Sequence, residues 1–448
     1  MTDPAHAAYD DVQRALLARW PETRLEPSLD RIRALVHLLG DPQTTYPVIQ
    51  LTGTNGKTST GRMIDALLRQ MGLRTGQFTS PHLESMTERI NIDGEPASEE
   101  VFVRTYTDIA PYLEVVDRSQ PHPLSFFETI TGMAYAAFSD APVDVAVVEV
   151  GMGGSWDATS VVDAQVSVVT PVAVDHASYL GERPADIAVE KAGIIKPGSF
   201  AVLAEQTPEV AEVLAARVAE VGAGVAVEGD QFGVTLRLPG VGGQMLTLQG
   251  LAAEYTEVFL PLHGEHQARN AGCALAAVEA FVGGIELDLD VVRGAFGEVA
   301  SPGRLEVIRR SPVIVLDAAH NPAGAYAAAE AVQEAFSFSP LIGVVGVMAD
   351  KAVDEILAAF EPVMAHVVCT QNSLSRSLPA DELGDIAEGI FGPDRVHVRR
   401  RLDDAIDVAA GLAEEGGSYG EALGSGGVLV TGSVITVGEA RQLLGGPH

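Results

Sequence analysis

Cysteine is almost absent from this sequence: of 448 residues, only Cys273 and Cys369 are cysteines. They lie far apart and each within an apolar run, so we interpret both as small buried side chains in a reducing compartment and not as a disulfide. Long apolar runs are also absent, since none reaches the roughly 18 residues that a membrane-spanning helix needs. The N-terminus lacks the basic and then apolar pattern of a signal peptide. These absences predict a soluble, cytoplasmic protein without a membrane partner.

Positive charge is scarce as well, because 29 Lys and Arg residues stand against 61 Asp and Glu and leave a net charge of −32. This balance argues against nucleic acid or an anionic membrane as a partner. An anionic small molecule would therefore need a locally basic pocket. The length predicts two or three domains, the 47% of hydrophobic residues can fill their cores, and we expect a monomer.

A glycine-containing loop, Thr-Gly-Thr-Asn-Gly-Lys-Thr at residues 52–58, organises the rest of the chain. A short apolar run at residues 47–51 precedes it, and apolar residues at helical spacing follow it as far as Gly72, a C-cap candidate. The full G-x-x-x-x-G-K-[ST] pattern is not met, because Leu51 occupies the position of the first glycine.

The two glycines of this loop let the backbone turn tightly and direct N–H groups at an anion, while the following helix N-terminus adds partial positive charge. Lys57 is expected on the β- and γ-phosphates of a nucleotide, and the Thr58 hydroxyl on Mg²⁺. The alternative is an ordinary turn with one exposed lysine, but the strand–turn–helix setting favours phosphate binding. The expected nucleotide-binding residues of the loop are Gly53, Thr54, Asn55, Gly56, Lys57 and Thr58.

The order of apolar runs predicts an α/β fold. Residues 1–46 have a helical pattern, and from residue 48 to 174 apolar runs alternate with helical stretches, as in a mostly parallel sheet. Residues 226–262 alternate around a Pro-Gly turn and predict a small antiparallel β region, followed by a helix at about 266–281.

Near Ser301 the chain begins a second series of strands and helices. The strand-like runs there are 313–317, 341–347, 366–370, 395–398 and 428–431. We therefore predict a P-loop ATPase domain at residues 1–300, which binds nucleotide and substrate, and a Rossmann-like domain at residues 301–448.

Two strand-like runs of the first domain, 145–150 and 166–174, place polar residues near or just after their C-terminal ends. This is the position where open α/β sheets bind ligands. Glu149 lies among valines, where an unpaired carboxylate is costly, so a buried cation or a metal ion must compensate its charge. Asp175 and His176 follow the second run and offer a further metal ligand or phosphate contact. A structural histidine is an equal alternative.

Lys191 lies among small and apolar residues in the segment 187–194. Burial lowers the pKa of a lysine, so a neutral amine becomes populated. Such an amine can add CO₂ and become a carbamate, an anion that binds Mg²⁺. A buried ion pair with Glu190 is the structural alternative.

Ser80 and His82 follow a strand-like run at residues 74–78, on the same edge as the glycine loop. Ser80 offers an oxygen to a metal ion and His82 a polar contact, whereas the alternative is a Ser-Pro turn with a partly exposed histidine. Arg89 can hold a carboxylate through two hydrogen bonds, and an exposed salt bridge is its alternative.

Nine short segments, taken in order, give the sequence a resemblance to a known family. They are Gly53-Thr-Asn-Gly-Lys-Thr58, Phe78-Thr-Ser-Pro-His-Leu83, Glu149-Val-Gly-Met-Gly-Gly154, Asp175-His176, Glu190-Lys-Ala-Gly-Ile194, His266-Gln-Ala-Arg-Asn270, Pro302-Gly-Arg304, Asp317-Ala-Ala-His-Asn-Pro322 and Thr431-Gly-Ser433. Together they resemble folylpolyglutamate synthase/dihydrofolate synthase, of the ATP-dependent Mur ligase superfamily, over residues 29–441. The sequence departs from the family pattern at Ser155-Trp156, where an arginine and a variable residue are common, at Ser160, usually asparagine, and at Ala318, usually glycine.

The resemblance implies a ligase of folate biosynthesis and one-carbon metabolism. ATP phosphorylates the carboxylate of a pteroate or folate, and the amino group of L-glutamate attacks the acyl phosphate to give an amide, ADP and phosphate. Lys57 would hold the phosphates and His320 would help to bind glutamate or phosphate. The further residues implied at ATP are Asn270, Arg304 and Asp317, and glutamate ligation is implied for the C-terminal domain.

Two Mg²⁺ sites are implied by the same resemblance. Ser80 and Glu149, with Thr58, would hold the first ion. Glu149, His176 and a carbamylated Lys191 would hold the second. The residues implied in catalysis are Lys57, His176, Lys191 and His320.

Folate is implied to bind at Phe126, Phe127 and Glu128, where an aromatic ring can stack on the pterin and a carboxylate can hydrogen-bond to it; ordinary core packing is the alternative for the phenylalanines. Asp30 and Arg31 match the segment that bifunctional members use for dihydropteroate, and a surface salt bridge is their alternative. The implied substrate contacts are Asp30, Arg31, His82, Arg89, Phe126, Phe127, Glu128 and Asp157.

Two other functions remain open at this point. A Mur-type peptide ligase shares the ATP chemistry but would need an additional N-terminal UDP-binding domain, for which residues 1–46 are too few. A nucleotide-dependent regulatory switch is the second, although Arg304 and the segment 317–321 fit closure over a reaction better. We expect the linker at residues 301–303 to act as a hinge for such a closure.

Overall fold

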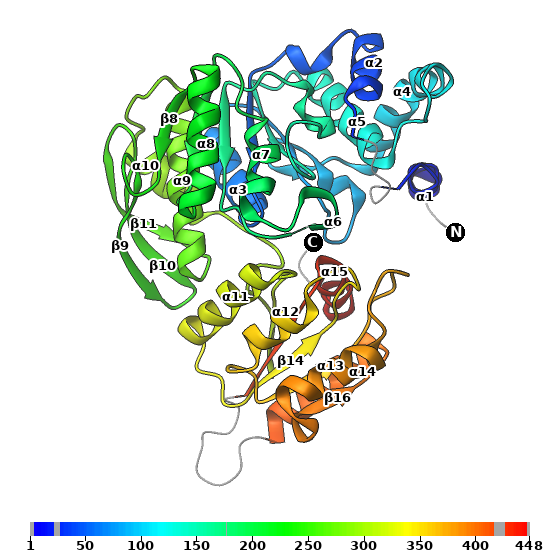
Figure 1. Ribbon diagram of the computed structural model, residues 1–448, viewed down its shortest axis with the longest axis vertical. Helices are drawn as coiled ribbons and strands as arrows, with labels where there is room; N and C mark the ends of the chain where they lie inside the picture. The colour runs from blue at the N-terminus through cyan, green and yellow to red at the C-terminus, as the bar shows by residue number, and fades with distance from the viewer. Residues whose placement is uncertain (1–3, 22–26, 176, 416–425, 446–448) are drawn as a thin grey trace. The chain divides into compact units, whose positions relative to one another are not determined.

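The computed structural model describes residues 4–21, 27–175, 177–415 and 426–445 (Figure 1). The chain divides into two compact units. The first unit comprises Met1–Leu236, Leu246–Phe259 and Ala268–Val299, and the second comprises Arg237–Met245, Leu260–Gln267 and Ala300–His448. No helix in the described ranges is both long and apolar enough to cross a membrane.

The first unit is built on an eight-stranded sheet with the order β4-β3-β2-β5-β1-β6-β7-β8. Neighbouring strands from β2 to β8 are parallel, and β3 and β4 add an antiparallel edge. The strands are β1 (Val48–Thr52), β2 (Thr75–Phe78), β3 (Ile90–Ile92), β4 (Glu95–Pro96), β5 (Val145–Glu149), β6 (Val166–Val169), β7 (Phe200–Leu203) and β8 (Gly224–Val227). Because β1 lies between β5 and β6, the loops after these three strands emerge at one edge of the sheet.

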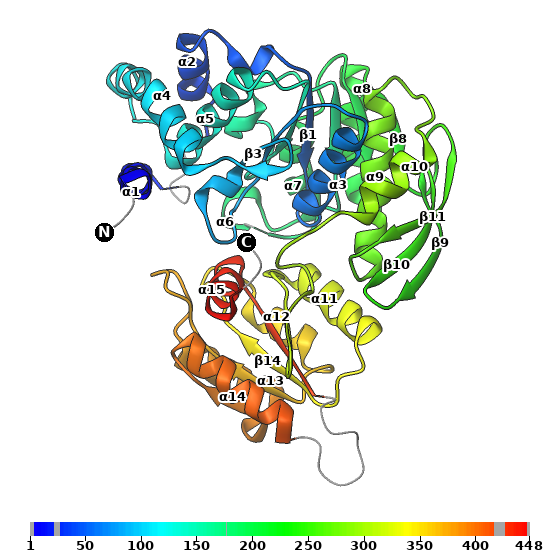
Figure 2. The ribbon, with the colours of Figure 1, turned by 180° about the vertical axis from the view of Figure 1, so that it is seen from behind.

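Helices cover both faces of this sheet, and Figures 1 and 2 show α2, α4 and α5 at one end of the unit and α8, α9 and α10 at the other. One apolar core includes Leu35, Phe102 and Phe138, and a second, with Ile187 and Leu214, lies under α7 and α8. The helices are α1 (Pro4–Leu17), α2 (Asp30–Leu38), α3 (Lys57–Gln70), α4 (Glu99–Ser119), α5 (Phe126–Asp140), α6 (Ala177–Leu180), α7 (Pro184–Ala192), α8 (Pro208–Val221), α9 (Glu265–Phe281) and α10 (Leu289–Gly297), with short 3₁₀ helices η1 (Pro42–Thr44), η2 (Met86–Arg89) and η3 (Ala158–Val161).

A three-stranded sheet with the order β11-β10-β9 occupies the region of the predicted antiparallel β structure. Its strands are β9 (Gly233–Gly240), β10 (Gly243–Gln249) and β11 (Glu254–Leu260). The chain positions of all three strands cross the division between the two units.

The second unit has a six-stranded sheet with the order β12-β13-β17-β14-β15-β16, parallel except at β12. Its strands are β12 (Glu306–Arg310), β13 (Val313–Leu316), β14 (Leu341–Val345), β15 (His366–Cys369), β16 (Val396–Val398) and β17 (Gly427–Thr431). Its helices are α11 (Pro322–Ala335), α12 (Val353–Phe360), α13 (Ala380–Phe391), α14 (Leu402–Glu415) and α15 (Val434–Leu444), with the 3₁₀ helix η4 (Pro393–Arg395). The predicted α/β fold class is confirmed, whereas β12 was not predicted because its charged, half-buried residues lack an apolar run.

The strand predicted at residues 166–174 is wrong in its second half, since β6 ends at Val169. Pro171 has no N–H to donate to a sheet and ends the ladder. Its carbonyl instead accepts hydrogen bonds from the backbone N–H groups of Thr54 (2.9 Å) and Asn55 (3.4 Å). The residues after β6 therefore pair with the glycine loop.

Candidate functional site

The glycine loop joins β1 to α3, and two of its positions admit only glycine. Gly53 has φ +148°, and a Cβ there would lie 1.8 Å from the hydroxyl oxygen of Thr170. Gly56 is the N-cap residue of α3 with φ +87°, and a Cβ there would lie 2.6 Å from Oδ1 of Asn270. The geometry fits an anion-binding turn at a helix N-terminus, and it brings Asn270, predicted from α9, directly against the loop.

Two lysine amines meet at one carbonyl of this loop. Nζ of Lys57 donates to the Gly53 oxygen (3.0 Å) and to the Thr54 oxygen (3.3 Å), and Nζ of Lys191 donates to the same Gly53 oxygen (2.8 Å). Lys191 is only 5% exposed. Its burial, and then the nearby charge of Lys57, lower its pKa to about 7. The predicted setting of Lys191 is therefore confirmed, with a substantial fraction of neutral amine near neutral pH.

Glu149 ends β5 beside the loop and is 4% exposed. Its carboxylate accepts hydrogen bonds from the hydroxyl of Thr58, 3.0 Å from both oxygens, and from the hydroxyl of Thr79 at 2.5 Å. Within the described part of the chain it forms no ion pair, so neutral hydroxyls alone stabilise its charge. A buried anion in this state favours a cation as its missing partner.

Thr79 was missed in the sequence, where the neighbouring Ser80 was named as the metal ligand. The register explains its place: Phe78 of β2 pairs with Val148 of β5, so the next residues of the two strands, Thr79 and Glu149, are neighbours. A cis peptide bond joins Ser80 to Pro81. The role predicted for Ser80 stays a prediction.

The other predicted metal ligand, His176, lies outside the described residues. Over the described ranges, no group of three or more His, Cys, Asp or Glu side chains is arranged to hold a metal ion. Asp175 lies close enough to act electrostatically on Lys191, where its charge opposes the lowering of the lysine pKa.

The loop after β5 packs tightly against α7. Asp157 is buried within it, and its carboxylate accepts hydrogen bonds from the backbone N–H groups of Met152 (2.9 Å) and Thr159 (2.9 Å) and from the Thr159 hydroxyl (2.5 Å). Burial raises the pKa of Asp157 above its ordinary value. These bonds organise the loop, and a contact of Asp157 with substrate stays a prediction.

Glu190 does not pair with Lys191. Its carboxylate accepts a hydrogen bond from the hydroxyl of Ser155 instead. The alternative of a buried Lys–Glu pair is therefore wrong, which leaves the Lys191 amine on the carbonyl of the glycine loop.

Residues predicted for folate form two linked polar groups near α5. Nε of Arg31, from α2, donates to both carboxylate oxygens of Glu128 (2.9 and 3.1 Å), and both side chains are largely buried. Glu128 also caps α5 through Ser125. The surface ion pair considered for Arg31 is therefore wrong, because its partner is a buried residue from another helix. Asp30, at the first position of α2, is exposed.

Arg89 is buried, in contrast to the exposed salt bridge considered for it. Its Nε donates to Nδ1 of His82 (2.9 Å), and its guanidinium carbon lies 4.9 Å from the ring centre of Phe126. Burial, and then the charge of Arg89, lower the pKa of His82 to about 3, so this histidine is neutral. Phe127 packs against Gly151, where a Cβ would lie 2.4 Å from its ring.

In the second unit, Asp317 directly follows β13 and is buried. Its carboxylate accepts hydrogen bonds from the backbone N–H groups of Leu305 (3.0 Å) and Ala319 (2.9 Å). Burial raises the pKa of Asp317, and the charge of Arg304 opposes this rise. His320 follows closely, with Nδ1 2.9 Å from the Ala318 carbonyl oxygen. The three residues predicted from this domain therefore lie on adjoining turns.

Known proteins are similar to this chain over nearly its whole length. The Mur ligase middle domain matches residues 51–278, and the Mur ligase glutamate ligase domain matches residues 303–434. Dihydrofolate synthase/folylpolyglutamate synthase of Mycobacterium tuberculosis is 51% identical over 97% of this chain and 93% of its own length. The chain belongs to the folylpolyglutamate synthase/dihydrofolate synthase family of Mur ligases.

Solved structures of this family agree. The M. tuberculosis folylpolyglutamate synthase complexed with ADP superposes with a TM-score of 0.96, at 51% identity over 99% of both chains. Escherichia coli FolC in complex with DHPP and ADP superposes with a TM-score of 0.85, at 27% identity over 99% of both chains. The resemblance predicted from nine segments is confirmed, and so is the enzyme class, an ATP-dependent C–N ligase.

The departures from the family pattern have local explanations. Ser155 bonds to Glu190, as described above, and Ser160 donates its hydroxyl to the Gly154 carbonyl (2.5 Å) while accepting from Gln50 (3.2 Å). Ala318 keeps a negative φ, so its Cβ introduces no backbone strain. These loops therefore accommodate the departures from the family pattern through local hydrogen bonds and an unstrained backbone.

Proposed function

We propose that this chain adds L-glutamate to reduced folates and also to dihydropteroate, at the expense of ATP. The observation that supports this most directly is that the glycine loop, Glu149 and Lys191 lie together at one edge of the first sheet. The chain that carries them is a member of the folylpolyglutamate synthase/dihydrofolate synthase family. We also propose the predicted division of labour, with nucleotide and folate bound by residues 1–300 and glutamate ligation served by residues 301–448.

The nucleotide is held first by the glycine loop. Its backbone N–H groups and the N-terminus of α3 receive the phosphates, and Asn270 lies beside Gly56 at the entry to this turn. Lys57 exchanges its two carbonyl partners for the β- and γ-phosphates, where its charge opposes the charge that develops during transfer. The family resemblance assigns Arg304 and Asp317 to the nucleotide as well, and His320 to glutamate or phosphate.

The donors at this edge fit Mg²⁺, which prefers oxygen ligands and retains several waters. Glu149 supplies the buried anion, Thr58 supplies a hydroxyl at the start of α3, and Ser80 follows the neighbouring strand. His176 and Lys191, carbamylated through its neutral amine, would hold the second ion together with Glu149. When bound, Mg²⁺ neutralises the phosphates and favours in-line transfer.

The chain's own residues contribute mainly position and charge. The γ-phosphoryl group moves to the substrate carboxylate and ADP leaves; the glutamate nitrogen then forms the amide bond as phosphate leaves. Such a reaction needs the acid, the amine and ATP held in line and sheltered from water, because water would hydrolyse the acyl phosphate. The burial of Glu149 and Lys191 beside the glycine loop suits this requirement.

The folate site is proposed at the group formed by Arg31, Glu128, Arg89, His82 and Phe126. Its buried arginines offer donors to a pterin or carboxylate, and Phe126 and Phe127 offer aromatic faces for stacking. The E. coli relative binds DHPP, which supports a pteroate substrate for this chain. Asp30 and Asp157 are assigned to substrate by the family pattern alone.

The deciding experiment measures ATP turnover with each substrate left out in turn. A ligase requires L-glutamate and either dihydropteroate or tetrahydrofolate, and mass spectrometry of the products should show one added glutamyl group. ADP formation at an equal rate without glutamate would instead identify a regulatory ATPase. Turnover of tetrahydrofolate but not of dihydropteroate would restrict the activity to folylpolyglutamate synthesis.

A further inference from the structure

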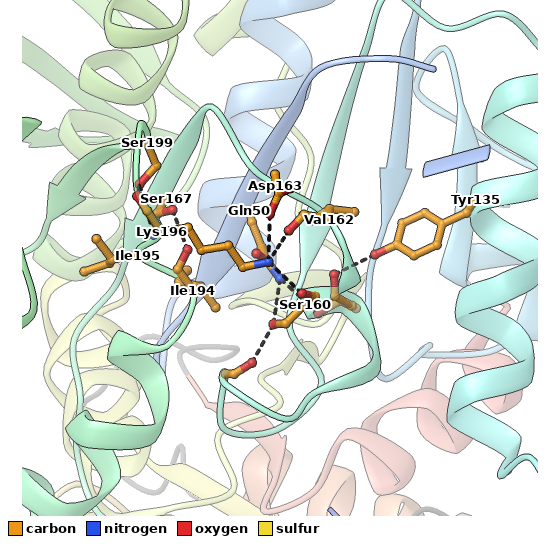
Figure 3. Close-up of polar contacts among 12 residues, drawn as sticks. Gln50, Tyr135, Ser160, Val162, Asp163, Ser167, Ile194, Ile195, Lys196 and Ser199 are labelled. Atoms are coloured by element: carbon orange, nitrogen blue, oxygen red, sulfur yellow. Dashed lines mark hydrogen bonds and ion pairs between the residues drawn. The ribbon is translucent and has the colours of Figure 1, made fainter. Parts of the chain in front are cut away.

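The segment after α7 contains a lysine that the proposed mechanism does not use. Nζ of Lys196 donates to the carbonyl oxygens of Ser160 (2.8 Å) and Val162 (2.5 Å), and it lies 3.3 Å from Oδ1 of Asp163 (Figure 3). These carbonyls belong to the C-terminal end of η3, where helical oxygens lack partners within the helix. The Lys196 ammonium group, which comes from a distant part of the chain, therefore caps the C-terminal end of η3.

The backbone around Lys196 is itself fixed. The hydroxyl of Ser167, in β6, donates to the Ile194 oxygen (2.9 Å), and the Lys196 backbone N–H donates to the hydroxyl of Ser199 (3.2 Å), as Figure 3 shows. The Lys196 side chain thus extends from a segment anchored on the sheet to the loop that follows β5.

The same loop also contacts α7 itself, at Glu190 and Lys191. A Cβ on Gly154 would lie 2.5 Å from the Glu190 oxygen and 3.0 Å from Cα of Lys191, and the backbone N–H of Ser155 donates to the Glu190 oxygen (3.0 Å). Residues 151–163 therefore contact the segment 184–196 at two points. One is a close backbone contact at Lys191, and the other is the reach of the Lys196 ammonium to η3.

We propose that Lys196 is a positioning residue for Lys191. By tying η3 to the segment that follows α7, it holds the loop after β5 against the backbone of Lys191 and so keeps the Lys191 amine at the Gly53 carbonyl. The inference rests on the proposed function, in which modified Lys191 serves the metal site, but it concerns only contacts within this chain. It gives a role to a half-buried lysine that the proposed mechanism does not use.

The test compares Lys196→Met, which keeps the chain length but removes all donors, with Lys196→Arg, which restores them. Mutation of a residue that orients a metal ligand typically lowers metal affinity or activity by about tenfold to a hundredfold. We expect Lys196→Met to raise the Mg²⁺ concentration for half-maximal rate by about tenfold or more and to lower kcat, with the Kd of ATP measured without Mg²⁺ nearly unchanged. Lys196→Arg should recover most of the loss.

A second readout does not depend on turnover. After equilibration with carbon-13-labelled CO₂, the wild type should give a carbamate resonance that Lys191→Ala abolishes, and Lys196→Met should weaken it. Arg217→Met is the matched control, because Nε of Arg217 donates to the neighbouring Ile195 oxygen (3.1 Å) without reaching η3. Asp163→Asn is a second control, since the Asp163 side chain is 94% exposed.

Each outcome decides the matter. Wild-type carbamate and Mg²⁺ dependence in Lys196→Met, or equal losses in Arg217→Met, would overturn the inference and leave the proposed function standing. A wild type without ligase activity would overturn the proposed function and the inference together. If Lys196→Met cannot be purified folded, Lys196→Gln takes its place, because it keeps one donor and should fall between the wild type and a complete loss.

Discussion

Replacement of Gly56 by alanine tests the glycine loop with a control from the same helix. Gly56 precedes α3 and has φ +87°, and Gly72 follows it and has φ +84°. Alanine is therefore strained equally at both sites, by about 1–2 kcal/mol. Only the surroundings differ: a Cβ at Gly56 would lie 2.6 Å from Oδ1 of Asn270, whereas at Gly72 nothing lies within 4 Å.

Overpacking typically costs about 1–3 kcal/mol, so Gly56→Ala should lose about 2–5 kcal/mol of unfolding free energy in total. Gly72→Ala should lose only the strain, about 1–2 kcal/mol. Urea denaturation of both variants measures this difference. Asn270→Ala removes the clashing group, so Gly56→Ala should cost less in that background, by about 1 kcal/mol or more.

Nucleotide binding separates the two variants further. Because a shifted Asn270 and a strained turn disturb the N–H groups of the loop, Gly56→Ala should weaken ATP binding by about tenfold or more, equivalent to about 1.4 kcal/mol. Gly72→Ala should bind ATP as the wild type does, in a calorimetric titration. Equal stability losses together with unchanged ATP affinity in Gly56→Ala would refute the assignment of this turn as the phosphate site.

Three further predictions concern charged side chains. Glu149→Gln should be at least as stable as the wild type in urea, because it removes an uncompensated anion, yet lose about a hundredfold or more of Mg²⁺-dependent activity. Burial lowers the pKa of Lys191 from 10.5 to about 7. Between these two pH values the unfolded chain binds one more proton than the folded chain, so the free energy of unfolding rises with pH across this window. Lys191→Met should flatten this rise. Arg31→Ala should destabilise the fold by about 3 kcal/mol by leaving Glu128 buried and unpaired, whereas Asp30→Ala should leave stability unchanged and impair only dihydropteroate turnover.

The glycine loop and most strands could be predicted because their signals are local. Glycine spacing, a preceding apolar run and helical periodicity all lie within residues 47–72. The same holds for Lys191, whose apolar neighbours in sequence already indicate its burial. The five parallel strands of the second unit likewise follow from short apolar runs between helical segments.

The partners of the buried charges could not be predicted, because they come from distant segments. Glu128 meets Arg31 across 97 positions of sequence, and Thr79 meets Glu149 only through the pairing of β2 with β5. No local pattern distinguishes Thr79 from Ser80 before this register is known. The early end of β6 had a visible signal in Pro171, which the apolar run around it obscured.

The amines of Lys57 and Lys191 share the carbonyl of Gly53. If Lys57 binds the nucleotide as proposed, this arrangement couples nucleotide binding to the protonation of Lys191. While Lys57 is near, its charge favours the neutral form of Lys191. A nucleotide bound at Lys57 as proposed would bring anionic phosphates and reverse this influence, so an unmodified Lys191 would gain affinity for a proton as ATP binds. By thermodynamic reciprocity, we then expect ATP to bind more tightly at lower pH and its binding to draw protons from the buffer near pH 7. Under the proposed carbamylation, carbon dioxide would meet the more reactive amine in the empty enzyme, so modification would precede nucleotide binding.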